Sequence, residues 1–266
     1  LELALPYRDA ARDADREPQG DDALQRHALV TALVAETLDD AQLRARGLLP
    51  PGHEGTGAAA QARMRATLLR EAIAQWRGDA PGERIEASLA LPGVAFDIRL
   101  PEVHDGRRAV ALAGSMKGKH RLRALVEHLA LAAVLGERAR TRLLWLEENR
   151  EGELELQQQD MPAMAREAAT ARLAGLVAMF DDGMTRPLPF APDAAYAYSS
   201  ALKEKGDAGA WKAAVAAFSG YQGYGDGHDP WFRLAFRGGD MLAARDDALG
   251  SEFVTLAQRV FDGGAA

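Results

Sequence analysis

Residues 94–133 decide the expected fold, and they read VAFDIRLPEVHDGRRAVALAGSMKGKHRLRALVEHLALAA. In residues 94–100 apolar side chains alternate with Ala95, Asp97 and Arg99. This period of two predicts a half-buried strand with Asp97 on its polar side. A second strand is predicted over 107–113. A helix is predicted over 119–135, because its apolar residues recur at helical spacing and Gly136 follows its last turn.

The neighbouring segments extend this pattern into a mixed α/β fold. Residues 85–91 also alternate, and Pro92-Gly93 between them and the next strand is a turn signal. We therefore expect an antiparallel meander of three strands, with a helix over 58–76 before it. Two further strands are expected after the helix over 119–135, at 140–147 and 153–158.

Three parts are expected along the chain. Residues 1–57 are predicted to be a linker and helical lead-in, 58–160 the α/β core, and 161–266 a C-terminal helical extension packed on the core. The acidic, aperiodic stretch 9–22 predicts the linker, and a glycine-rich loop is expected over 51–57. Helices are expected at the end of the chain over 161–180, 194–203, 208–218 and 251–261.

Composition excludes several classes of function. The 266-residue chain has no cysteine, which rules out disulfides and thiolate metal sites. Its formal charge of −7 argues against a protein that coats nucleic acid without specificity. Its apolar runs are too short to span a bilayer, so we expect a cytoplasmic protein without membrane contact. Because the sequence begins at Leu1, we expect it to be part of a longer protein.

The expected order of helix, three strands, helix and strand, with an acid on the second strand, resembles the PD-(D/E)xK (restriction-endonuclease-like) nuclease core. In that family this acid and an acid-x-Lys triplet on the third strand hold the metal. Asp97 matches the acid, but the triplet aligns with Leu112-Ala113-Gly114. A single carboxylate seldom holds Mg²⁺. We therefore predict a degenerate core, with Asp97 as a remnant and no metal or other cofactor.

Other residues do not replace the missing ligands convincingly. Glu127 and His128 are adjacent on the predicted helix and so face different sides of it, and His104-Asp105 lies in a turn. A polar pair that hydrogen-bonds to the sheet is the more frequent arrangement for Glu127 and His128. Asp229 precedes Pro230, which is equally well explained by a helix cap.

Two clusters are candidates for binding. The densest basic cluster consists of Lys117, Lys119, Arg121 and Arg123 at the start of the predicted helix, where backbone N–H groups also favour phosphate. A solvated charged face is the alternative. Trp231 and Phe232 lie in a segment rich in aromatic residues and glycine, and they are candidates for a partner surface or for burial in the domain's own core.

Three phrases together resemble one family. They are LRARGLLPPGHEG at 43–55, LRALVEHLALAA at 122–133 and DPWFRLAFRG at 229–238. They are similar to the C-terminal domain of RecC, the gamma chain of the RecBCD (exodeoxyribonuclease V) complex. The resemblance covers nearly the whole chain, and the helicase-like part of RecC is missing from it, so Chi recognition is not assigned here.

The resemblance implies a non-catalytic, nuclease-like domain. Such a domain helps to hold the RecB and RecD subunits, lies on the path of DNA ends or of the forked duplex, and serves double-strand break repair and homologous recombination. The absent acid-x-Lys triplet agrees with this, and catalysis is then expected in other chains. Two alternatives remain open, an active Mg²⁺-dependent nuclease that recruits an acid from another segment, and a pure protein-interaction module.

Overall fold

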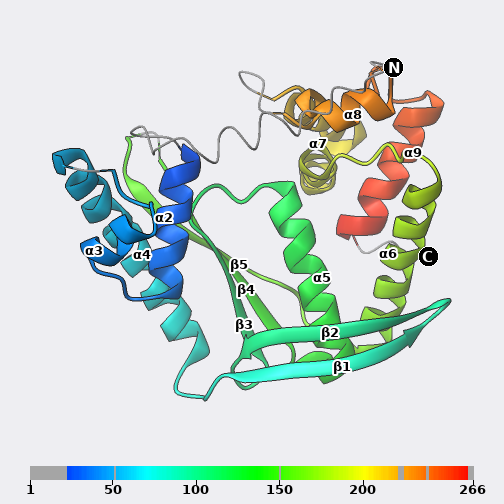
Figure 1. Ribbon diagram of the computed structural model, residues 1–266. Helices are drawn as coiled ribbons and strands as arrows, with labels where there is room; N and C mark the ends of the chain where they lie inside the picture. Colours follow the sequence, from blue (N-terminus) through cyan, green and yellow to red (C-terminus); the bar gives the residue numbers. More distant parts are fainter. Residues whose placement is uncertain (1–22, 51, 150, 221–224, 238–239, 263–266) are drawn as a thin grey trace, which may run out of the picture. The chain divides into compact units, whose positions relative to one another are not determined.

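The structure is a computed structural model that describes residues 23–50, 52–149, 151–220, 225–237 and 240–262 (Figure 1). Its mixture of helices and strands confirms the expected α/β class. The chain forms two compact units, which are described separately. The first contains residues of 1–78, 109–115 and 142–159, and the second residues of 79–108, 116–141 and 160–266. The expected three-part division stays a prediction, and the linker at 9–22 lies outside the described residues.

Three helices make up the helical part of the first unit within its described residues. They span Ala23–Ala35 (α2), Asp40–Ala45 (α3) and Gly52–Arg77 (α4). Asp39 caps α3, because its side chain accepts a hydrogen bond of 2.8 Å from the N–H of Gln42. Helices α2 and α3 lie within residues 1–57, for which the sequence predicted a linker and helical lead-in.

The expected loop over 51–57 was wrong, because α4 already begins at Gly52. Gly55 is buried in the first turns of this helix, and a Cβ atom there would lie 2.0 Å from the carbonyl oxygen of Pro50. The glycine thus permits close packing inside a helix. Its local sequence, rich in Gly and Pro, is typical of a turn, and tertiary packing overrides that tendency.

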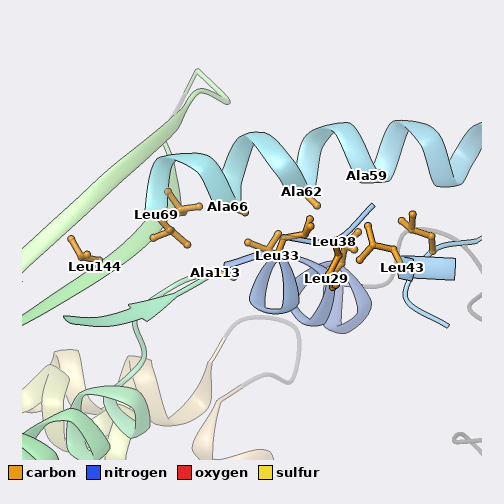
Figure 2. Packing of buried hydrophobic residues seen from close by; sticks show 13 residues of the cluster. Leu29, Leu33, Leu38, Leu43, Ala59, Ala62, Ala66, Leu69, Ala113 and Leu144 are labelled. Atoms are coloured by element: carbon orange, nitrogen blue, oxygen red, sulfur yellow. The ribbon is translucent and has the colours of Figure 1, made fainter. Parts of the chain in front are cut away.

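Small side chains on α4 let α2 approach closely. Figure 2 shows Ala59, Ala62 and Ala66 of α4 facing Leu29 and Leu33 of α2, and all five residues are buried. Alanine also has the most favourable intrinsic helix propensity of all residues. The same core includes Leu144 and Leu146 of the sheet, and Ala113, which directly follows a strand of that sheet.

The greater part of a three-stranded sheet completes the first unit, while residues 107–108, 140–141 and 160 of its strands belong to the second unit. Its strands are Arg107–Leu112 (β3), Arg140–Glu148 (β4) and Leu154–Asp160 (β5), in the order β3-β4-β5. Strands β4 and β5 confirm the expected strands at 140–147 and 153–158. The central strand β4 buries four successive residues, 143–146, as a strand covered on both faces does.

The second unit contains a separate β-hairpin. Strands Glu83–Leu91 (β1) and Val94–Val103 (β2) are antiparallel, with Leu91 opposite Val94 across a turn in which Gly93 has φ 79°. The expected three-stranded meander was wrong, because β3 pairs with β4 and not with β2. Strand alternation in the sequence shows which face of a strand is buried, but it does not say which strands pair.

The hairpin packs on two helices of the same unit, Gly118–Leu135 (α5) and Arg166–Thr185 (α6). Ile98 and Leu100 of β2 share a core with Leu129 of α5 and Leu173 of α6. Figure 1 shows both strands crossing the ends of these helices. A short 3₁₀ helix, Gly136–Arg138, follows α5.

A third core lies in the C-terminal helices of the second unit. These helices are Pro192–Ser219 (α7), Pro230–Ala235 (α8) and Ala248–Ala257 (α9), with a 3₁₀ turn at Asp226–His228 and a π-helical turn at Gln258–Asp262. Gly206, with φ 66°, interrupts α7 between the two helices expected at 194–203 and 208–218. Tyr198 is buried in this core and donates a hydrogen bond to Asp207. Among the described residues, no helix is long and apolar enough to cross a membrane.

Candidate functional site

The basic cluster lies at the N-terminus of α5, where this helix meets the N-terminus of α7. Gly118, the first residue of α5, has no room for a side chain, because a Cβ atom would lie 2.0 Å from the carbonyl oxygen of Pro192. The carboxylate of Asp193 accepts a hydrogen bond of 3.2 Å from the N–H of Lys119. One backbone donor of the candidate phosphate site is therefore already occupied by a carboxylate of the same chain.

A second carboxylate, that of Asp226, lies at the N-terminus of α7. Asp226 accepts hydrogen bonds from the N–H groups of Asp193 and Ala194, at 2.9 Å and 3.2 Å, and so caps α7. Burial raises the pKa of Asp226, and the bond from Ala194 and the charge of Lys117 act in the opposite direction. The positive charge of Lys117 is thus close enough to Asp226 to favour the ionised form of this buried carboxyl group.

The four cations of the cluster fall into two groups. Lys117, Lys119 and Arg123 are exposed, and Arg123 donates a hydrogen bond of 3.0 Å to Glu127. Arg121 is only 9% exposed, and its guanidinium lies 4.3 Å from the centre of the Tyr196 ring. This cation–π contact joins α5 to α7. The structure therefore brings three of the four predicted residues to the surface and places Arg121 inside.

Asp97 lies on the exposed side of β2, opposite Ser88 of β1, while Ile98 and Leu100 beside it are buried. This confirms the expected half-buried strand. Within the described residues, no group of three His, Asp or Glu side chains could hold a metal ion. Residues 112–114, where the sequence predicted the position of the acid-x-Lys triplet, are the end of β3 and the two residues after it.

The other acids and histidines near the core have structural partners. His128 is buried, and its ring nitrogens lie 3.0 Å from Thr141 Oγ1 of β4 and 3.0 Å from the Pro162 carbonyl oxygen. Glu127 accepts hydrogen bonds from Arg108 of β3 and from Arg123. The expectation that Glu127 and His128 hydrogen-bond to the sheet is thus confirmed.

His104 and Asp229 also have hydrogen-bond partners in the backbone. His104 Nδ1 lies 2.7 Å from the carbonyl oxygen of Ala80. Asp229 caps α8 by accepting hydrogen bonds from the N–H groups of Trp231 and Phe232, at 2.8 Å and 3.1 Å, as the sequence Asp-Pro predicts.

The candidate partner residues on α8 differ from each other. Trp231 is 56% exposed, and Leu234, one turn later, is 64% exposed. Phe232 is half-buried, stacks on Phe236 at a centroid distance of 5.0 Å and contacts the edge of Phe218 at 5.8 Å. Phe232 thus packs in the core of the C-terminal helices, whereas the Trp231 side chain is exposed at the surface.

Sequence reasoning missed Asp193 and Asp226, the two carboxylates that cap or contact the helix ends. The dipeptide Pro192-Asp193 is a helix-start signal, so an acid at the N-terminus of α7 could have been found. Its contact with Lys119 has no local signal, because 74 positions separate the two residues.

The described residues therefore define a mixed α/β domain with an exposed basic cluster at a helix end and an isolated strand aspartate. A family model described as the RecC C-terminal domain matches residues 1–203. The chain belongs to this family, whose members are subunits of the RecBCD complex, which acts in DNA repair. No individual curated protein matches the sequence.

Proposed function

We propose that this domain is a non-catalytic scaffold and DNA-guiding part of a RecBCD-type complex, with the RecB and RecD subunits and a DNA end or forked duplex as its partners. The match to the RecC C-terminal domain over residues 1–203 carries this proposal. A role in double-strand break repair and homologous recombination, and a cytoplasmic location, follow from the same membership and are part of the proposal.

The chemistry of the site supports a non-catalytic role. A metal-dependent nuclease needs several oxygen ligands around Mg²⁺. Asp97 is exposed on a two-stranded hairpin, and residues 112–114 contain neither an acid nor a lysine. We therefore propose that the PD-(D/E)xK core is degenerate and that Asp97 is its remnant. The rival proposal, an active nuclease, requires further ligands beside Asp97, and the described residues hold no group of three side chains that could bind a metal ion.

The exposed cations support guidance of DNA. Lys117, Lys119 and Arg123 are available to phosphates, whereas Arg121 serves to hold α5 against α7. The acids Asp193 and Asp226 at the same helix end favour a second candidate, a protein-interaction module without DNA contact, because carboxylates repel phosphate.

A charge reversal separates these two candidates. In the full-length protein assembled with its partner subunits, Lys117→Glu with Lys119→Glu should weaken binding of a forked duplex about ten-fold and reduce the salt dependence by about two ions. Fluorescence anisotropy at several salt concentrations measures both. The matched control, Lys205→Glu with Lys212→Glu on the exposed surface of α7, changes the net charge equally and should leave binding nearly unchanged. Unchanged binding in both variants would favour the interaction module.

A further inference from the structure

Helices α5 and α7 begin without a capping side chain of their own. The residues at their N-cap positions are Lys117 and Ala191, whose side chains do not accept a hydrogen bond from an N–H group. Asp193 of α7 instead accepts the bond from the N–H of Lys119, and Asp226 accepts two bonds from the start of α7. The start of each helix is therefore held by an acid from another part of the chain.

The 3₁₀ turn that carries Asp226 contacts both ends of α7. Near the C-terminus of the helix, His228 Nε2 lies 3.0 Å from the carbonyl oxygen of Ser219, and Gly225 packs so closely on the Phe218 carbonyl oxygen that a Cβ atom would not fit. Near the N-terminus, the turn is held by the two hydrogen bonds of Asp226, at 2.9 Å and 3.2 Å. We call these two bonds the Asp226 clasp, because they fasten the turn to the start of α7.

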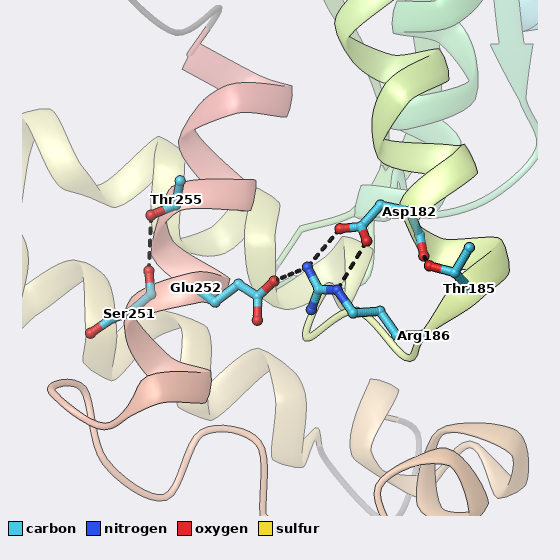
Figure 3. Close-up of polar contacts among 6 residues, drawn as sticks. All are labelled: Asp182, Thr185, Arg186, Ser251, Glu252 and Thr255. Atoms are coloured by element: carbon cyan, nitrogen blue, oxygen red, sulfur yellow. Dashed lines mark hydrogen bonds and ion pairs between the residues drawn. The ribbon is translucent and has the colours of Figure 1, made fainter.

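The charge of Asp226 is balanced differently from that of other acids that join helices in this unit. Glu252 of α9 contacts the guanidinium of Arg186 at 2.6 Å, as Figure 3 shows. Asp226 is bonded to two uncharged N–H groups, and the cation that favours its ionised form is Lys117. Burial, and then the charge of Asp193, act in the opposite direction and raise the pKa of Asp226. Part of what keeps Asp226 ionised thus comes from a lysine that we propose to bind DNA.

A DNA phosphate at the basic cluster competes with Asp226. It brings a second negative charge to the helix ends at which Asp193 and Asp226 already lie, and it attracts Lys117. Like charges repel each other more strongly in a half-buried site than in open water, because the solvent screens them less. The hydrogen bonds of ionised Asp226 to the start of α7 therefore weaken when phosphate binds.

We propose that the Asp226 clasp is a conformational device that DNA opens, so that phosphate bound at Lys117 and Lys119 releases the 3₁₀ turn from the start of α7. This inference rests on the proposed function, because it takes the basic cluster as the DNA contact. The turn leads directly into α8, on which the Trp231 side chain is exposed. DNA bound at the start of α5 thus changes how the segment before α8 is held. Since coupling between two sites is reciprocal, the closed clasp weakens DNA binding by the same factor.

Hydrogen exchange followed by mass spectrometry tests the proposal in the full-length protein assembled with its partner subunits, with and without a saturating forked duplex. The N–H groups of Asp193 and Ala194 report on the clasp directly, because both are bonded to Asp226. We expect DNA to speed their exchange about five-fold, which is at the lower end of couplings between two sites. Peptides that cover residues 225–237 should also exchange faster when DNA is bound.

Two variants of Asp226 separate the hydrogen bonds from the charge. Asp226→Ala removes both, so the N–H groups of Asp193 and Ala194 should exchange fast with or without DNA. Asp226→Asn keeps an oxygen acceptor without the charge, so their exchange should stay slow with or without DNA. Both variants should bind the forked duplex about five-fold more tightly in fluorescence anisotropy, because neither carries the opposing carboxylate. The matched control, Glu252→Gln, removes an equal charge from α9 and should change neither the exchange nor the affinity.

The proposal is overturned if DNA binds the unaltered protein and leaves the exchange of Asp193 and Ala194 unchanged or slower, or if Asp226→Asn responds to DNA as the unaltered protein does. Unchanged DNA affinity in both Asp226 variants would also contradict it. The variant with Lys117→Glu and Lys119→Glu distinguishes this failure from a failure of the proposed function. If that variant loses DNA affinity while DNA leaves the exchange in the unaltered protein unchanged, the clasp alone fails. If it binds DNA as tightly as the unaltered protein, DNA guidance and the clasp both fail.

Discussion

Replacing Gly118 with alanine should lower the free energy of unfolding by about 3 kcal/mol, because the structure has no space for the added methyl group. Its Cβ atom would lie 2.0 Å from the Pro192 carbonyl oxygen and 2.7 Å from Asp193 Cα. Both are backbone atoms of α7, so no side-chain rotation relieves the overlap. The start of α5 must then move away from α7.

Urea denaturation of the purified chain measures this effect, and a second glycine provides the control. Gly175 lies in α6 with open space where a Cβ atom would lie, so Gly175→Ala should raise the free energy of unfolding by about 0.5–1 kcal/mol. If Gly118→Ala were as stable as Gly175→Ala, the close approach of α5 and α7 would be refuted. We also expect Gly118→Ala to weaken binding of the forked duplex, since Lys117 and Lys119 flank this glycine.

The second large effect concerns His128. His128→Leu should cost about 2–3 kcal/mol of stability, because it leaves the Thr141 hydroxyl and the Pro162 carbonyl oxygen buried without the imidazole partner. Urea denaturation at neutral pH measures the loss. His53→Leu, on the exposed surface of α4, is the matched control and should change stability by less than about 0.5 kcal/mol.

The same histidine makes stability depend on pH. Burial lowers the pKa of His128 below its ordinary value of 6.5; the Pro162 bond opposes this and the charge of Arg172 adds to it. The unfolded chain therefore takes up the proton at a higher pH than the folded chain. Stability from this residue is complete above pH 6.5 and falls below it, by about 1.4 kcal/mol per pH unit until the folded-state pKa is reached. His128→Leu should remove this part of the slope; an unchanged slope would contradict a buried, neutral His128.

Local patterns predicted most elements of the fold. Alternation identified β1 and β2, and helical spacing followed by Gly136 identified α5. The pairing of β3 with β4 was not predictable, because the alternation along a strand shows which of its faces is buried and not which strand lies beside it. The helical start of α4 was missed because Gly55 is used for contact with Pro50 rather than for a turn.

The candidate site was predictable in composition and not in geometry. A run of Lys and Arg at a helix start is visible in the sequence, but the burial of Arg121 against Tyr196 depends on α7, more than seventy positions later. The same holds for Asp193, whose carboxylate reaches the N–H of Lys119. The exposure of Phe180 and Met184 was also missed, since the two residues have the spacing of core residues.

Incubation of the purified chain with linear duplex DNA and Mg²⁺ tests most directly whether this domain is catalytic. We expect no cleavage beyond that of Asp97→Ala, because one exposed carboxylate on a hairpin cannot hold the metal for phosphoryl transfer. The full-length protein in its complex, with Asp97→Ala, should likewise degrade DNA at the unaltered rate. Cleavage by the chain that requires Mg²⁺ and disappears in Asp97→Ala would contradict a non-catalytic scaffold.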